Sequence, residues 1–224
     1  MAQVIVFDVN ETLLDLAALD DLFSEILGSA GTRQAWFQQV LRSALVTTVV
    51  GEYCNYSEIA VAAIESIAAR RGIELRDDDC DRVLEGMLHL PPHSDVVAGL
   101  DQLRVAGFKL ATLSNMVEPV SRKQLSNAGL IDYFEAVLSA DAVRTLKPAA
   151  DPYRYATKKL GIPIRDMRLV AAHSWDIAGA LKAGSKGAFV TRSGDVLDPL
   201  FPPPDIVGKD VSEFAVKIIE KDLP

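Results

Sequence analysis

The sequence has few cysteines, no long apolar run and no cluster of positive charge, and each absence narrows what it can do. Its two cysteines, Cys54 and Cys80, have no Cys or His near them at the spacing of metal ligands, so we expect buried free thiols. No apolar run approaches the roughly 18 residues that a membrane span needs. The chain begins with a strand pattern and shows no basic segment before an apolar one, so we expect no secretory signal and a cytoplasmic protein.

Charge and length set further bounds. The formal net charge is -8, and the basic residues are scattered. Nucleic acids and anionic membrane surfaces bind cationic patches, so neither is an expected partner, whereas a small anionic substrate in a local positive pocket is compatible with this charge. With 224 residues, 49% of them hydrophobic, the chain suits one large domain or a core with a smaller insert.

The segment Val4–Asp15 is the clearest signal in the chain. Four apolar residues run directly into Asp8, and a polar turn follows. A short β-branched run of this kind predicts a buried strand of a parallel sheet, because both faces of such a sheet are covered. Asp8 would then stand at the carboxyl end of the strand, where open α/β sheets bind ligands. This segment alone fits a nucleophile, a metal ligand or a residue that only caps a turn.

Helical periodicity fills the next part of the chain. Apolar spacing predicts four helices, at residues 16–27, 33–50 with Thr32 as N-cap, 57–72 and 77–88. Four successive helices without a strand do not fit a βαβ alternation. We therefore expect residues 16–92 to form a helical cap subdomain, which ends at Pro91-Pro92.

Strands and helices alternate from residue 93 onward. The pattern predicts strands at 108–113, 136–138, 168–172, 188–191 and, at an edge, 206–207. The helices between and after them are expected at 94–104, 117–128, 152–160, 177–183 and 211–220. Such alternation indicates a doubly wound parallel α/β sheet, with residues 1–15 and 93–224 as its core domain.

Polar residues follow one predicted strand after another, namely Asp8, Ser114 with Asn115, Lys147 and Asp176. Because the carboxyl ends of parallel strands point the same way, these side chains are expected to meet in one crevice. A single Ser-Asn or Lys-Pro pair is usually a loop residue or a helix cap. Four such groups, each after a predicted strand, are harder to explain as loop residues or helix caps.

These motifs resemble the haloacid dehalogenase superfamily, and within it the L-2-haloacid dehalogenase-like (type II) branch. The resemblance covers essentially the whole chain. It rests on the segments Phe7–Thr12, Leu113–Asn115, Leu146–Pro148 with Tyr153, and His173–Asp176. It implies a Rossmann-like core with an inserted helical cap, and an active site between the two.

The resemblance also implies roles for the catalytic residues. Asp8 would be the nucleophile that forms a covalent ester, which splits one hard step into two. Thr12 would hold the loop after the strand, and Lys147 would keep Asp8 ionised by its charge. Asp176 would position Lys147 and the water that hydrolyses the ester. Ser114 and Asn115 would bind the substrate carboxylate and orient Asp8.

The residues expected to contact the substrate are Val9, Asn10, Phe37, Ser114, Asn115, Tyr153, His173 and Trp175. The favoured activity is that of an (S)-2-haloacid dehalogenase, a hydrolase of carbon–halide bonds whose substrate is a small 2-haloalkanoic acid. Dimers are common among the relatives, so a homodimer is the assembly that the resemblance suggests.

Two positions separate this activity from the magnesium phosphatases that make up most of the superfamily. Phosphatases carry a second Asp two residues after the nucleophile as a general acid, and this chain has Asn10, which has no titratable proton. The phosphatases hold Mg²⁺ with two carboxylates that lie four residues apart before the last helix. In this chain Asp176 supplies one of them, but Ala172 stands at the position of the other. We therefore expect no cofactor. Mg²⁺ would be required only if the chain is a phosphatase of a small phosphorylated metabolite.

Four departures from the dehalogenase pattern concern the substrate pocket. The relatives have an Arg directly after a Trp of the cap, which attracts the leaving halide, and here Phe37 follows Trp36. Arg33 lies one helical turn earlier, and we hypothesise that it substitutes. Asn10 stands where the relatives have a Tyr. A binding protein of the same fold, without efficient turnover, is a further alternative.

The last two departures are Ala171 and His173, which stand where the relatives have Ser and Asn. His173 has two interpretations. It is either a hydrogen-bonded structural group, or a site residue able to donate to substrate or water near neutral pH.

Overall fold

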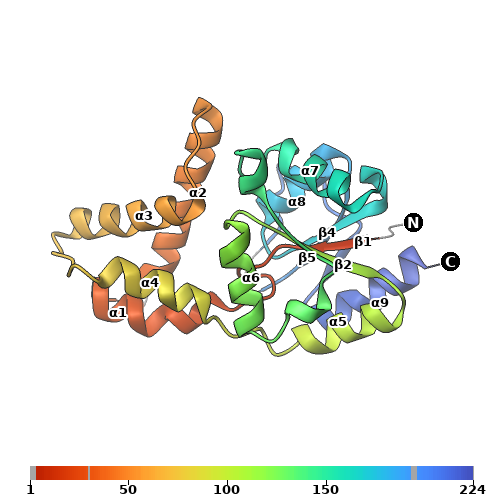
Figure 1. The fold of residues 1–224 in the computed structure, drawn as a ribbon, viewed down its shortest axis with the longest axis horizontal. Coiled ribbons are helices and arrows are strands. Elements are labelled where there is room, and N and C mark those ends of the chain that lie inside the picture. The colour runs from red at the N-terminus through yellow and green to blue at the C-terminus, as the bar shows by residue number, and fades with distance from the viewer. Residues whose placement is uncertain (1–3, 30, 193–195, 224) are drawn as a thin grey trace.

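The computed structural model describes residues 4–29, 31–192 and 196–223, and its centre is a six-stranded parallel sheet (Figure 1). The strand order is β3-β2-β1-β4-β5-β6. The strands are β1 (Val4–Phe7), β2 (Lys109–Ser114), β3 (Ala136–Ser139), β4 (Met167–Ala171), β5 (Lys186–Val190) and β6 (Ile206–Gly208). The doubly wound α/β fold predicted from the sequence is confirmed, with the first strand of the chain in the middle of the sheet.

Helices cover both faces of the sheet, which explains why its strands are continuously apolar. Figure 1 shows α5 (Val96–Val105) and α9 (Val211–Asp222) on one face and α7 (Ala150–Leu160) and α8 (Ser174–Ala183) on the other. The side chains of β1 alternate between the two layers, with Ile5 and Phe7 in the cluster that contains Phe214, and Val4 and Val6 in the cluster that contains Tyr153. Helix α6 (Glu118–Asn127) follows β2.

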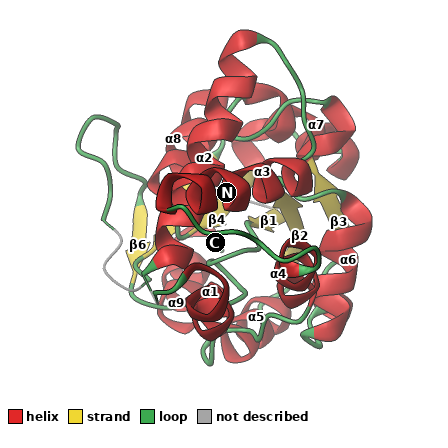
Figure 2. Cartoon of the chain, turned by 90° about the vertical axis from the view of Figure 1, so that its left-hand side faces the viewer, coloured by secondary structure: helices red, strands yellow, loops and turns green. Residues whose placement is uncertain are grey.

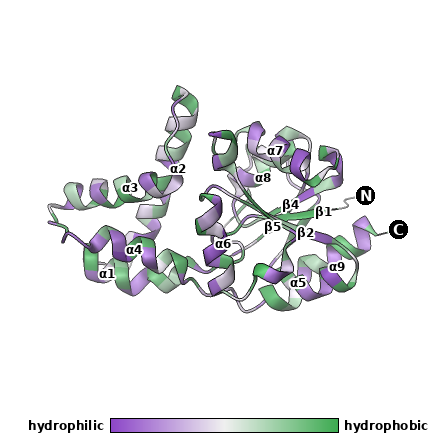
Figure 3. Cartoon of the chain, in the orientation of Figure 1, coloured by the Kyte–Doolittle hydropathy of each residue, from purple (hydrophilic) through white to green (hydrophobic). Residues whose placement is uncertain are grey.

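The four helices predicted between residues 16 and 92 are α1 (Asp20–Leu27), α2 (Thr32–Val50), α3 (Tyr56–Arg71) and α4 (Asp79–Leu88). They gather at one end of the sheet, and the view from that side shows them in front of the strands (Figures 1 and 2). Trp36 joins three of these helices, because its ring lies 5.0 Å from that of Phe23 and its Nε1 donates to the carbonyl oxygen of Ala60 at 2.9 Å. Figure 3 shows helices that mix polar and apolar residues around a mostly apolar sheet, as expected for helices with one buried face.

The chain leaves and rejoins the sheet at two segments that lie side by side. The amide of Asp15 donates to the carbonyl oxygen of Pro91 at 2.8 Å, and the amide of His93 donates to that of Leu13 at 3.0 Å. An isolated antiparallel bridge joins Leu14 to Pro92 between these bonds.

Several predicted helix starts differ from the observed ones, and two of the differences involve helix caps. Gly31, not Thr32, is the N-cap of α2; Thr32 lies inside the helix, fully buried, and its hydroxyl donates to the carbonyl oxygen of Phe23 at 3.4 Å. Helix α3 begins before Ser57, because Asn55 and Glu58 form a capping box in which each side chain accepts from the other residue's amide. Among the described residues, no helix is both long and apolar enough to cross a bilayer.

Candidate active site

Asp8 stands at the carboxyl end of β1 and shares one buried ammonium group with Asp176. The Lys147 Nζ lies 2.8 Å from Oδ1 of Asp8 and 2.6 Å from Oδ2 of Asp176, and it also donates to the carbonyl oxygen of Leu113 at 2.8 Å. All three charged side chains are buried. The structure thus brings together the groups that follow β1, β3 and β4 in the sequence.

The charges of this cluster determine its protonation. Burial disfavours a charged carboxyl, but the ammonium of Lys147 and the hydrogen bond to His173 outweigh it and hold the pKa of Asp8 below its usual range. Burial likewise opposes the charge of Lys147, but the two carboxylates raise its pKa. The pKa of Asp176 is raised, because burial and the charge of Asp8 outweigh the attraction of Lys147. Asp8 is therefore an ionised carboxylate at neutral pH.

Hydrogen bonds fix the loops that carry the catalytic groups. The Thr12 hydroxyl donates to Oδ2 of Asp8 at 2.9 Å and accepts from the amide of Ala172 at 3.0 Å, which ties the loop after β1 to the end of β4. Asn115 accepts from the Lys147 amide at 2.8 Å through Oδ1, and its Nδ2 donates to the Lys147 carbonyl at 3.4 Å. Ser114 accepts from the amide of Met116 at 3.1 Å.

Tyr153 and Lys147 together occupy both carboxylate oxygens of Asp176. The Tyr153 hydroxyl donates to Oδ1 of Asp176 at 2.6 Å, and Lys147 donates to Oδ2. Burial, with the charge of Asp176, raises the pKa of Tyr153 well above its usual value, so Tyr153 is a neutral donor. In this arrangement Tyr153 holds Asp176, and Asp176 holds the ammonium group of Lys147 in position.

A small cavity of about 20 Å³ lies between the strand ends and helices α2 and α3. Its lining residues are Asp8, Asn10, Phe37, Tyr56, Ser114, Asn115, Lys147, His173 and Trp175. Most of the residues expected to contact substrate are in this set. Tyr56, the first residue of α3, was not predicted from the sequence; its position directly after the N-cap Asn55 gives no signal that it would face Asp8.

His173 is both a hydrogen-bond partner of Asp8 and part of an aromatic stack. Its Nδ1 lies 3.1 Å from Oδ2 of Asp8. Its ring lies 5.3 Å from that of Phe37 and 5.2 Å from that of Trp175, with the second pair nearly parallel. Burial opposes protonation, but the hydrogen bond and charge of Asp8 raise the pKa of His173. This histidine therefore joins helix α2 to the nucleophile.

The family follows from a comparison of the whole sequence with known families. A family model described as haloacid dehalogenase-like hydrolase matches residues 2–184. The chain belongs to this family.

Relatives in the haloacid dehalogenase family match nearly the full chain. The sequence is 25% identical to an (S)-2-haloacid dehalogenase of Pseudomonas putida over 95% of each chain. It is 28% identical to that of Pseudomonas sp. strain YL over 90% of this chain and 88% of the relative. The L-2-haloacid dehalogenase of Xanthobacter autotrophicus has a solved structure with a TM-score of 0.90, 24% identity, and coverage of 98% of this chain and 99% of that one. This last similarity shows the shared fold.

The site does not fit the magnesium ion that phosphatases of the haloacid dehalogenase superfamily use. The Nζ of Lys147 lies between the two carboxylates, where a cation shared by Asp8 and Asp176 would have to lie. Ala172, at the position of the second phosphatase carboxylate, has no carboxylate to offer a metal ion. Asn10 is engaged elsewhere, since its Oδ1 accepts from Nε2 of Gln124 at 3.1 Å. Within the described ranges, no three His, Cys, Asp or Glu side chains form a group that could hold a metal.

Two sequence expectations about the pocket of this dehalogenase-like site need correction. Arg33 does not line the cavity; it forms ion pairs with Glu11 at 2.9 Å and Asp20 at 2.5 Å, so its charge links the loop after β1 to helices α1 and α2. The side chain of Val9 is fully buried in the hydrophobic core and does not line the cavity.

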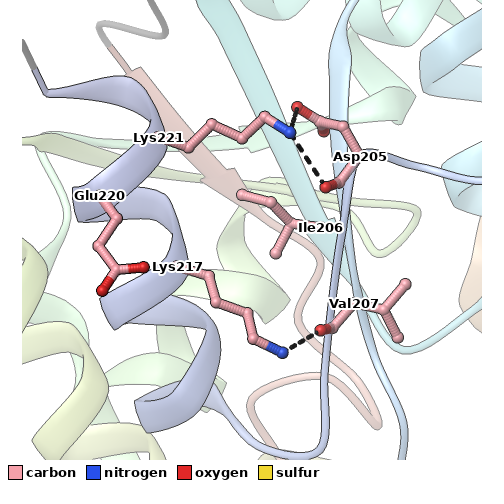
Figure 4. Close-up of a pocket in the computed structure, with 6 residues that line it drawn as sticks. All are labelled: Asp205, Ile206, Val207, Lys217, Glu220 and Lys221. Carbon is pink, nitrogen blue, oxygen red and sulfur yellow. Dashed lines mark hydrogen bonds and ion pairs between the residues drawn. The ribbon is translucent and has the colours of Figure 1, made fainter.

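A second hollow lies beside the edge strand β6 and helix α9, as Figure 4 shows. Its polar groups bind one another: Lys221 contacts Asp205 at 3.3 Å, and Lys217 donates to the carbonyl oxygen of Val207 at 2.7 Å. This surface contains none of the catalytic groups.

Proposed function

We propose that this chain is an (S)-2-haloacid dehalogenase that acts on small 2-haloalkanoic acids. The observation that carries the proposal is the ionised carboxylate of Asp8, buried at a strand end with Lys147 at 2.8 Å, in a cavity lined by core and cap side chains. The names of the relatives, which include (S)-2-haloacid dehalogenases and a haloacetate dehalogenase of Moraxella, support it.

In the first step, Asp8 attacks the carbon that carries the halogen, and the halide leaves with the bonding electrons on the opposite side. The carbon is inverted and an aspartyl ester forms. Burial favours this step, since it replaces the water around the carboxylate with a few fixed donors. The donors here are Lys147 on Oδ1 and Thr12 on Oδ2.

In the second step, water adds to the Asp8 carbonyl carbon, and the 2-hydroxy acid leaves with the oxygen that Asp8 supplied. Lys147 is placed to stabilise the negative charge that develops on the Asp8 oxygen, because preorganised donors in a buried site stabilise such charge strongly. Ser114 and Asn115 line the cavity and are proposed to hold the substrate carboxylate. Asn115 also holds the Lys147 backbone, so a substrate bound there is aligned with the nucleophile.

We further propose that residues 16–92 act as a cap that opens to admit the substrate. The cavity volume of about 20 Å³ is near what one water molecule requires and too small for a haloalkanoic acid. Phe37 and Tyr56 form its cap side. The paired segments around Leu14 and Pro92 are the two crossings at which such a motion would bend the chain.

Halide release tests the proposal. L-2-chloropropionate, chloroacetate and fluoroacetate are incubated with the protein in the presence of EDTA, with Asp8→Asn as the control. We expect release that survives EDTA and is lost in the variant. No release from any of these acids, together with a magnesium-dependent release of phosphate from small phosphorylated metabolites, would identify a phosphatase. Binding of a haloacid without turnover by an intact Asp8 would identify a binding protein.

A further inference from the structure

Tyr56 brings a hydroxyl group to the active-site cavity and gives it no partner. The side chain is 6% exposed and lines the cavity together with Asp8. Its hydroxyl makes no hydrogen bond with any of the described residues. Buried polar groups are nearly always hydrogen-bonded, so this hydroxyl points to a ligand that is present only when substrate is bound.

The hydroxyl of Tyr56 is a neutral donor. Burial, with the charges of Asp8 and Asp176, raises the pKa of Tyr56 above its usual value. The effect of these two carboxylates also means that the hydroxyl lies within electrostatic reach of the catalytic groups. Tyr56 therefore keeps its proton at neutral pH and can donate a hydrogen bond to an anion in the cavity.

Tyr56 lies on the side of the cavity that faces the nucleophile. Asp8 comes from the strand ends, whereas Phe37 on α2 and Tyr56 on α3 line the cavity from the helices that stand in front of the strands (Figure 2). In a displacement with inversion, the attacking oxygen, the carbon and the halogen lie in line. The halogen of a bound substrate is then directed away from Asp8, toward the wall that Phe37 and Tyr56 form.

A halide that departs toward this wall needs a hydrogen-bond donor, because an unpaired anion is costly in a buried site. Phe37 has no polar side-chain atom, and Arg33 is held in its two ion pairs outside the cavity lining. The ammonium group of Lys147 already directs its three N–H groups to three acceptors on the strand side. The hydroxyl of Tyr56 is the donor that helices α2 and α3 contribute to the cavity lining.

We propose that Tyr56 is a catalytic residue of the first half-reaction, in which its hydroxyl donates a hydrogen bond to the departing halide. This inference rests on the proposed dehalogenase function. The bond between an Asp8 oxygen and the carbon forms as the carbon–halogen bond breaks, and the halide leaves with the bonding electron pair. Tyr56 keeps its proton throughout, so the halide departs as a hydrogen-bonded anion and the step consumes no acid or base.

The test compares halide release from L-2-chloropropionate and L-2-bromopropionate in single turnovers with excess enzyme. Tyr56→Phe keeps the ring and removes only the hydroxyl, and thermal melting checks that the variant is folded. Chloride release should slow by about 10–100-fold, the usual contribution of a hydrogen bond to a charged group. Bromide release should slow less, because the larger ion is the weaker hydrogen-bond acceptor. Tyr155→Phe, which removes a hydroxyl from α7 outside the cavity lining, is the control and should match wild type.

Inhibition by propionate separates a contact with the halide from a contact with the substrate carboxylate. Propionate has the carboxylate but no halogen, so its inhibition constant should be the same in wild type and Tyr56→Phe. Weaker inhibition in the variant would mean that Tyr56 holds the carboxylate, and equal slowing of chloride and bromide release would mean that it only packs. Either result, or unchanged release of both halides, overturns the inference. Absence of halide release by the wild-type enzyme would instead contradict the proposed function itself.

Discussion

Lys147 joins the two acidic strand ends of the site, with its Nζ 2.8 Å from Asp8 and 2.6 Å from Asp176. This side chain is fully buried, and its ion pairs connect the nucleophile to Asp176 and, through it, to Tyr153. Its charge is the main reason that Asp8 is ionised despite burial. The position of one ammonium group thus couples the reactivity of Asp8 to the packing of α7 and α8.

Replacing Lys147 with Met should raise the pKa of Asp8 and move activity to higher pH. In wild type the Asp8 pKa lies below its usual range, so the burst of halide should persist to low pH, as far as the protein stays folded. Without the cation, the acid limb of the burst rate should move up by about 1–3 pH units. The rate is measured by rapid quench across pH, beside Lys158→Met, an exposed lysine of α7, as control. An unshifted acid limb in a folded Lys147→Met would contradict the role of Lys147.

Gly179→Ala should damage the site although residue 179 contacts no substrate. An added Cβ would lie 2.6 Å from the carbonyl oxygen of Pro148 and 2.6 Å from the Tyr153 hydroxyl, so the loop that carries Lys147 must shift. Overpacking of this kind typically costs about 1–3 kcal/mol. We expect a lower thermal midpoint and a slower halide burst. Gly31→Ala, where the added Cβ meets nothing within 4 Å, is the control. Full activity of Gly179→Ala would show that this close contact does not position Lys147.

Phe37→Arg tests the halide end of the pocket. Phe37 lines the cavity at the position where the resemblance in sequence implies a halide-attracting arginine, and its ring lies 5.3 Å from that of His173. A cation there should stabilise the departing halide, so we expect the first half-reaction to accelerate about tenfold, which corresponds to about 1.4 kcal/mol. Phe37→Leu controls for loss of the ring. An unchanged or slower burst would mean that the halide leaves elsewhere.

Arg168→Met should lower stability and leave the chemistry intact. Arg168 is fully buried in β4 and donates to Asp222 at 2.6 Å and Asp205 at 2.6 Å. Removing one partner of a buried ion pair typically costs about 3–5 kcal/mol. Urea unfolding measures this loss, and kcat in the folded range should be unchanged. Arg154→Met, which removes an exposed ion pair with Asp151, should change stability by less than about 1 kcal/mol.

The stabilisation that Arg168 provides through its ion pair with Asp205 should decrease at low pH. Burial opposes ionisation of Asp205, but the hydrogen bond from Arg168 holds its pKa below the usual value. The stabilisation is therefore complete above the unfolded pKa of Asp205 and is lost as pH falls through the folded pKa. The difference in unfolding free energy between wild type and Arg168→Met should shrink on acidification. A difference that stays constant down to low pH would contradict this coupling.

The sequence predicted the strand-end residues of the site and the positions of most helices, because local sequence patterns determine both. The apolar run before Asp8 and the polar residues after the later strands indicated one crevice, because parallel strands end at one edge. The structure brings Asp8, Lys147 and Asp176 into contact there. The ranges of most helices also agreed to within a few residues, since apolar periodicity and glycine stops are local signals.

What the sequence did not predict depends on contacts between distant segments. Arg33 lies on a suitable helix for a halide ligand, but Glu11 and Asp20 pair with it, and no spacing rule shows this. Tyr56 reaches the cavity from the start of α3, which packs against α2. Thr32 is a residue type typical of an N-cap, yet its hydroxyl donates to the carbonyl oxygen of Phe23 in α1. Tertiary packing decided each of these positions.

The most direct test of the central claim is a single turnover of L-2-chloropropionate with excess enzyme in water labelled with heavy oxygen. If Asp8 forms the ester and water attacks its carbonyl carbon, the lactate released carries ordinary oxygen from Asp8. The heavy oxygen should then appear in the peptide that contains Asp8, by mass spectrometry after digestion. Heavy oxygen in the lactate, with an unlabelled Asp8 peptide, would show that water displaces the halide directly and would contradict the aspartyl-ester mechanism.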